Sequence, residues 1–167
     1  MQDNLFQSVD IKTIPAKGIS FDLTATPDEC RILSERFGVP AVHSFKLSGF
    51  VKGNDVLCYE GAFEAHITQT CVVSLEDFDS TVSGKFREFF SQNGTDFSSE
   101  TDFDIDMEDE TVDLIKNGRL DIGEIAAQQF GLELSAFPKK TDAYFEYKEA
   151  DFERPNPFAV LEKLVKK

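Results

Sequence analysis

The chain lacks several features that mark particular classes of protein. It has no tryptophan and only three cysteines, Cys30, Cys58 and Cys71, which are scattered along the sequence. An odd number of scattered cysteines argues against a disulfide framework and favours a reducing compartment. No segment contains the run of about 20 apolar residues that a membrane-spanning helix needs. The opening residues, MQDNLFQSVDIKT, also lack the basic and apolar regions of a signal peptide. We therefore expect a cytoplasmic protein.

Positive charge is scarce as well. The chain has 17 lysines and arginines against 31 aspartates and glutamates, for a net charge of −14. Such a field repels the phosphate backbone of nucleic acids and favours basic protein partners. The alternative is that the acidity only keeps the protein soluble. At 167 residues with 17 phenylalanines, the chain suits one domain with an aromatic core.

Apolar and polar residues largely alternate along the stretch from Leu57 to Val73. The apolar side of the alternation holds Leu57, Tyr59, Phe63, Ala65, Ile67, Cys71 and Val73. The polar side holds Glu60, Glu64, His66, Thr68 and Thr70. A period of two residues predicts a long strand with one buried face and one exposed face.

The string QTCVVSLEDF at residues 69–78, which ends this strand, resembles the YceD-like family, named for accumulation of the large-subunit ribosomal RNA. Members commonly carry Cys-x-x-Cys here. This chain has a single-cysteine form, with Cys71 kept and Ser74 in place of the second cysteine. Two later segments resemble the family in the same order. They are DIGEIAAQQFGLEL at residues 121–134, followed by AFP, and NPFAVLEKL at residues 156–164. The resemblance implies a part in large-subunit RNA accumulation or processing, where the proteins involved are basic.

The remaining patterns predict an α+β fold, with a curved antiparallel sheet of about six or seven strands and two or three helices. Residues 9–23 read as a hairpin that turns at residues 15–18. Thr26 and Glu29 form a capping box for a helix from Pro27 to about Phe37, which ends at Gly38.

A second hairpin is predicted to turn at residues 53–55 into the long strand, and a further strand runs through Val82, Phe86 and Phe90. Asp121 and Glu124 predict a second capping box, for a helix that runs to about Phe130. A short strand is expected near residues 143–147.

We expect residues 1–167 to form a single domain. Within it, residues 91–101 read as a mobile loop and residues 151–167 as a linker followed by a terminal helix.

An acidic stretch stands out between Asp96 and Asp113, which holds nine acidic residues and no basic one. Its spacing imitates part of a calcium loop, but Met107 occupies the position where such a loop needs glycine. The stretch is therefore either a solvated surface or a docking site for a Lys/Arg-rich protein. The candidate partner-binding residues are Asp102, Asp104, Asp106, Glu108, Asp109 and Glu110, with Phe158 and Leu161 of the terminal helix as apolar anchors.

Neither a metal site nor a catalytic site emerges from the sequence. Cys71 and His66 fall on opposite faces of the predicted strand, so they do not converge on a zinc ion. There is no G-x-S-x-G elbow, no Cys–His pair and no phosphate-binding glycine loop. We expect a protein without cofactor that acts by binding a basic ribosomal or assembly protein, so that its link to ribosomal RNA is indirect.

Two alternatives belong to other functional classes. The first is direct RNA binding by a local basic patch of Lys46, Lys52, Lys85 and Arg87, beside an exposed Phe50. The second is an RNA-processing enzyme that uses paired carboxylates and magnesium. That enzyme would need carboxylates gathered in a cleft, whereas the alternation predicts them spread along an outer edge.

Overall fold

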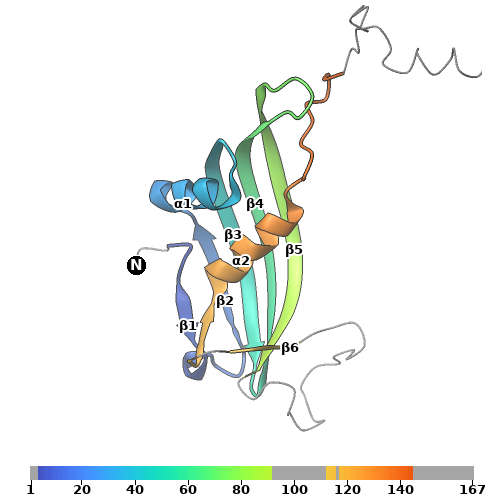
Figure 1. The fold of residues 1–167 in the computed structure, drawn as a ribbon. Helices are drawn as coiled ribbons and strands as arrows, with labels where there is room; N and C mark the ends of the chain where they lie inside the picture. The colour runs from blue at the N-terminus through green and yellow to red at the C-terminus, as the bar shows by residue number, and fades with distance from the viewer. Residues whose placement is uncertain (1–3, 92–111, 116, 145–167) are drawn as a thin grey trace, which may run out of the picture.

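Five strands form one sheet in the order β2-β3-β4-β5-β6, and two short strands, β1 and β7, pair separately. The computed structural model describes residues 4–91, 112–115 and 117–144 (Figure 1). The elements are β1 Ser8–Asp10, the 3-10 helix η1 Ile11–Thr13, β2 Ile19–Thr24, α1 Pro27–Phe37, β3 Ala41–Gly53, β4 Val56–Thr70, β5 Asp77–Ser91, β6 Val112–Leu114, β7 Arg119–Asp121 and α2 Ile122–Glu133.

The α+β class is confirmed, with a qualification about the sheet. Successive pairs from β2 to β5 are antiparallel, whereas β6 runs parallel to β5. The described strands are also divided between two sheets. Figure 1 shows β3, β4 and β5 as long, curved strands, with both helices on the same side of the sheet. Within the described residues, neither helix is long and apolar enough to cross a membrane.

The core lies between the sheet and the two helices. As predicted from the alternation, Tyr59, Phe63, Ala65 and Ile67 of β4 are buried on the helix side. The ring of Phe63 stacks on Phe45 at a centroid distance of 5.5 Å. Phe130 of α2 packs edge-on against both rings, so aromatic contacts join the helix to the centre of the sheet.

The prediction for α1 is confirmed at both ends. The Thr26 hydroxyl accepts a hydrogen bond from the Glu29 N–H, and the Glu29 carboxylate accepts one from the Thr26 N–H. This capping box satisfies donors that the first turn leaves without a partner inside the helix. At the other end, Gly38 adopts the left-handed conformation that ends many helices.

The predicted N-terminal hairpin is wrong. β1 pairs with β7, and β2 pairs with β3. The reason lies between the two strands, where the Asp10 carboxylate accepts a hydrogen bond from the Lys12 N–H and caps η1. That turn redirects the chain before Ile19, so β1 leaves the larger sheet. The turn at residues 15–18 is present, but it does not join two paired strands.

The second predicted capping box is also wrong. Asp121 precedes α2 but makes no capping hydrogen bond with its side chain. Glu124 instead receives two hydrogen bonds from Arg36 of α1, each of 2.7 Å. The helix continues past Gly131 to Glu133, because Gly131 packs under the ring of Phe37 rather than ending the helix.

Several predicted segments lie wholly or partly outside the described residues. They are the acidic stretch up to residue 111, the terminal helix, and most of the loop at residues 91–101. Ser91 itself is described, and it is the buried last residue of β5 rather than the start of a loop. Ala143 is described too, and it is not part of a strand.

Candidate functional site

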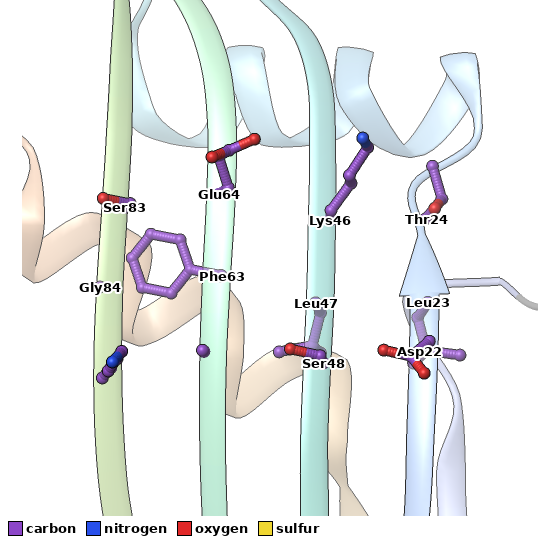
Figure 2. Close-up of a pocket in the computed structure, with 12 residues that line it drawn as sticks. Asp22, Leu23, Thr24, Lys46, Leu47, Ser48, Phe63, Glu64, Ser83 and Gly84 are labelled. Carbon is purple, nitrogen blue, oxygen red and sulfur yellow. The ribbon is translucent and has the colours of Figure 1, made fainter.

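The sheet has a polar outer face, which we define as the face opposite the two helices. Two rows of side chains cross this face over β2, β3, β4 and β5, as the strand register dictates. The first row is Thr24, Lys46, Glu64 and Ser83, and the second is Asp22, Ser48, Ala62 and Lys85. Figure 2 looks onto this face, with the first row in line across the four strands and both helices behind them.

A hollow of about 590 Å³ lies over these rows (Figure 2). Its lining comprises both rows together with Leu23, Leu47, Phe63 and Gly84, the residues between them on the same strands. Ser48, Ala62 and Ser83 are short, whereas the lysines on β3 and β5 are long. Small side chains flanked by long ones leave a depression on a curved sheet. The hollow presents ammonium, carboxylate and hydroxyl groups to a ligand.

The four cations proposed as an RNA-binding patch do share this face. Lys46 and Lys85 line the hollow, while Lys52 and Arg87 lie further along β3 and β5. Carboxylates interrupt the patch, because Lys46 lies directly opposite Glu64. Opposite charges at such cross-strand positions attract and partly cancel each other's field.

Arg87, two residues beyond Lys85 on β5, also lies opposite a carboxylate. It lies directly opposite Glu60 in the register, and its Nε is 3.8 Å from the carboxylate.

The predicted exposure of Phe50 is wrong. Phe50 is partly buried, because its ring covers Gly18, where an added Cβ would lie 2.5 Å from the ring. An aromatic ring that is partly covered in this way offers less area for stacking on a base.

A threonine, a histidine and an aspartate meet at one end of the outer face. The Thr68 hydroxyl donates to Asp79, 2.7 Å away, and His43 Nε2 lies 2.7 Å from the same hydroxyl. Since the hydroxyl proton points to Asp79, the histidine donates to the threonine rather than taking its proton. A base must accept the nucleophile's proton, so this exposed trio does not form a catalytic triad.

The turn after β4 is the motif that carried the family resemblance. Cys71 is fully buried, as its apolar face predicted, but its sulfur is also a hydrogen-bond acceptor. The N–H groups of Ser74 and Lys140 point to Sγ, at 3.5 Å and 3.4 Å. Hydrogen bonds from the Ser74 side chain, from its backbone and from the Lys140 backbone lower the pKa of the thiol to about 6.

The sequence pattern predicts a small apolar side chain at Cys71 and does not reveal this acceptor role. One of the two N–H donors to the sulfur is local in sequence, because Ser74 follows Cys71 by three residues. The other donor is the N–H of Lys140, which is 69 residues away from Cys71. The adjacent Val72 N–H also donates to the Pro138 carbonyl. Residues 138–140 therefore dock on the turn, and no local pattern indicates that contact.

The described part of the chain contains no cluster of side chains suited to bind a metal ion. No three side chains of His, Cys, Asp or Glu come together there. His66 is exposed on the outer face, where its Nδ1 lies 3.0 Å from the Thr81 hydroxyl, whereas Cys71 is buried. The predicted partner-binding residues, from Asp102 to Glu110 with Phe158 and Leu161, lie outside the described residues, so their placement stays a prediction.

Comparison with known proteins gives one match. A family model described as "Large ribosomal RNA subunit accumulation protein YceD" matches residues 59–165. That range includes most of β4, the turn at Cys71, β5 and α2. No curated protein and no solved structure matches the chain.

Proposed function

Since the chain belongs to the YceD family, described as large ribosomal RNA subunit accumulation proteins, we propose that it serves ribosome biogenesis by binding a basic protein. The partner is a ribosomal or assembly protein, and the contact with ribosomal RNA is made through it. The protein acts in the cytoplasm and catalyses no reaction.

The observation that carries this proposal is the net charge of −14. Proteins that assemble on ribosomal RNA must neutralise its phosphates, so they are rich in lysine and arginine. An acidic protein attracts such partners and raises their rate of encounter. The same field opposes binding of free RNA. The paired charges on the outer face agree with this view, because Glu64 and Glu60 face two of the four cations.

The proposed docking residues are the acidic group from Asp102 to Glu110, with Phe158 and Leu161 as apolar anchors. We expect that neutralising Asp104, Asp106, Glu108 and Glu110 with Asn or Gln slows association by about tenfold at low salt. The variant should also lose most of the salt dependence of that step, because charges at the rim of an interface act mainly on association rates. Stopped-flow mixing with individually purified basic proteins of the large subunit measures both effects.

A matched control removes the same four charges elsewhere. Asp22, Glu35, Asp55 and Glu133 are exposed carboxylates on other parts of the surface. If this control slows association as much as the first variant, net charge alone sets the rate and the acidic group is not a docking site. In cells, the first variant should lower the amount of mature large subunits relative to small ones, and normal levels would contradict the proposal.

One observation favours a second candidate function, direct RNA binding, because Lys46 and Lys85 both line the hollow. The charge argument predicts that the purified protein binds large-subunit RNA fragments no more tightly than about 10⁻⁶ M at physiological salt. A mobility-shift assay measures this affinity. Tighter, length-dependent binding that is lost in the double variant Lys46→Gln, Lys85→Gln would make the hollow an RNA site.

A further inference from the structure

Large apolar side chains are exposed around the tip of the β4–β5 hairpin. Val72 and Leu75 belong to the turn, and their exposed fractions are 48% and 77%. Phe137 and Tyr144, both 79% exposed, belong to the segment that follows α2. Figure 1 shows this segment, in orange, running alongside the hairpin tip. We call these four residues the hairpin-tip surface.

Hydrogen bonds and a shared hollow join the two parts of this surface. The Val72 N–H donates to the carbonyl of Pro138, the neighbour of Phe137. Tyr144 lines a hollow of about 200 Å³ together with Ser74 and Glu76 of the turn. Apolar groups that are exposed side by side and rimmed by polar residues are characteristic of protein interaction sites.

Leu75 has an unusual backbone conformation within this turn. Leu75 has φ of 59°, in the left-handed region that glycine and asparagine tolerate best. Asn117 is the other described non-glycine residue with positive φ, and asparagine is common in that conformation. Leucine bears a steric cost in this conformation, and the side chain of Leu75 is exposed. The hydrogen bonds that close the hairpin turn hold Leu75 in this conformation, and they leave its side chain outside the core.

The turn is also held rigidly. Leu75 donates its N–H to the Cys71 carbonyl, and Cys71 donates its own N–H to the Glu76 carbonyl, each over 2.9 Å. The buried Cys71 sulfur accepts N–H groups from Ser74 and from Lys140, so it links the turn to the segment after α2. A surface that is ordered before binding loses less conformational entropy when a partner docks.

Acidic groups outnumber basic ones at the rim of the hairpin-tip surface, where the exposed Lys139 also lies. Glu76 and Asp142 line the small hollow, and Asp77 begins β5 beside it. Lys140 also lines the hollow, but its ammonium forms an ion pair with Glu76 at 3.3 Å. An apolar patch with an acidic rim complements a protein segment that carries an apolar anchor flanked by lysine or arginine.

We propose that the hairpin-tip surface is where the basic partner packs against this protein. An apolar side chain of the partner contacts Leu75, Phe137 and Tyr144, and its cations pair with Asp77 and Asp142. The inference rests on the proposed function, and it adds a packed contact to the electrostatic attraction. Leu75 is the central anchor, since the turn leaves its side chain exposed to a partner.

The substitution Leu75→Asn tests this directly, because asparagine suits positive φ and lacks the apolar side chain. We expect the variant to be at least as stable as the natural protein in urea unfolding. Its affinity for a purified basic large-subunit protein that binds the natural chain should fall at least tenfold, mainly through faster dissociation. The control Leu114→Asn changes a leucine that is 56% exposed on β6, at the other end of β5, and should bind normally.

Each outcome bears on a different part of the proposal. If the natural protein binds none of the basic large-subunit proteins, the proposed function fails and the inference fails with it. If the natural protein binds and Leu75→Asn binds equally well, only the inference is overturned. A photo-crosslinking residue in place of Phe137 should capture a Lys/Arg-rich peptide of the same partner. Crosslinks to a second copy of this chain would instead identify the surface as a self-association site.

Discussion

Replacing Gly123 with alanine is expected to destabilise the folded protein by about 3 kcal/mol, the upper range for an overpacked core. A Cβ at this position would lie 2.0 Å from the carbonyl oxygen of Leu5 and 2.7 Å from its carbonyl carbon. Both are backbone atoms of a fully buried residue, so a rotamer change does not relieve the clash. Urea unfolding, followed by circular dichroism, measures the loss.

Hydrogen bonds hold both the N-terminal segment and the start of α2 in place, so the two backbones do not separate easily. The next residue after Leu5, Phe6, donates its N–H to the Glu29 carboxylate at 3.0 Å, which holds the N-terminal segment against α1. On the other side, the Tyr59 hydroxyl donates to the Ile122 carbonyl and holds the start of α2. The close approach of two backbones is what requires glycine at this position.

The matched control is Gly131→Ala in the same helix. There an added Cβ would meet the ring of Phe37 at 2.5 Å, and the far end of this partly buried side chain moves more easily than a backbone. Alanine is also favoured over glycine inside a helix by about 1 kcal/mol, which offsets part of the cost. We expect a change within about 1 kcal/mol. Equal losses at both positions would contradict the assignment of the effect to the Leu5 backbone.

The second large effect is expected from Glu29→Gln, which should cost about 2–3 kcal/mol at neutral pH. One carboxylate oxygen of Glu29 accepts the Phe6 N–H, and the other accepts the N–H and the hydroxyl of Thr26. Glutamine has a single oxygen, so its amide nitrogen must face one of these donors. An N–H group of α1 or of the N-terminal segment is then left without an acceptor in a buried place.

The cost of Glu29→Gln should also depend on pH. Burial raises the pKa of the Glu29 carboxyl, but hydrogen bonds from the Phe6, Thr26 and Leu5 backbone and the Thr26 hydroxyl outweigh it, so the pKa is lowered. A lowered pKa means that the charged form stabilises the fold above the usual glutamate pKa. This contribution is lost as pH falls through the lowered pKa. Urea unfolding over a range of pH should show the two proteins converge in acid.

Glu124→Gln is the appropriate comparison, because it makes the same chemical change in a carboxylate with two short hydrogen bonds. Its partner Arg36 is on α1, and both side chains are more than a third exposed. Exposed ion pairs contribute about 0–1 kcal/mol, so the loss should stay within that range. A loss as large as that of Glu29→Gln would show that burial is not the deciding factor.

The parts of the fold that the sequence predicted correctly are those that local patterns specify. The two-residue alternation from Leu57 onwards identified β4 and its buried face, because side chains on a strand point alternately to opposite sides. Thr26, Glu29 and Gly38 set both ends of α1 through contacts within a few residues. The string around Cys71 also identified the family without knowledge of the fold.

The partners of each strand and cap required the tertiary structure. Whether β1 pairs with β2 or with β7 depends on competition between distant strands, and the capped turn at Ile11–Thr13 decides it. Glu124 follows Asp121 at capping-box spacing, yet a bidentate contact with Arg36, 88 residues away, takes its carboxylate instead. Local spacing does not reveal such a competitor.

The candidate surfaces divide in the same way. The amino-acid sequence by itself determined that the protein is acidic. Its motifs also determined membership of a family named for large-subunit ribosomal RNA accumulation. The hollow on the outer face and the contact of residues 138–140 with the hairpin turn arise only when distant segments meet. Lys140 reaches the Cys71 sulfur across 69 residues of sequence, and that contact gives the hairpin tip its fixed shape. A pattern with a period of a few residues carries no information about contacts at that separation.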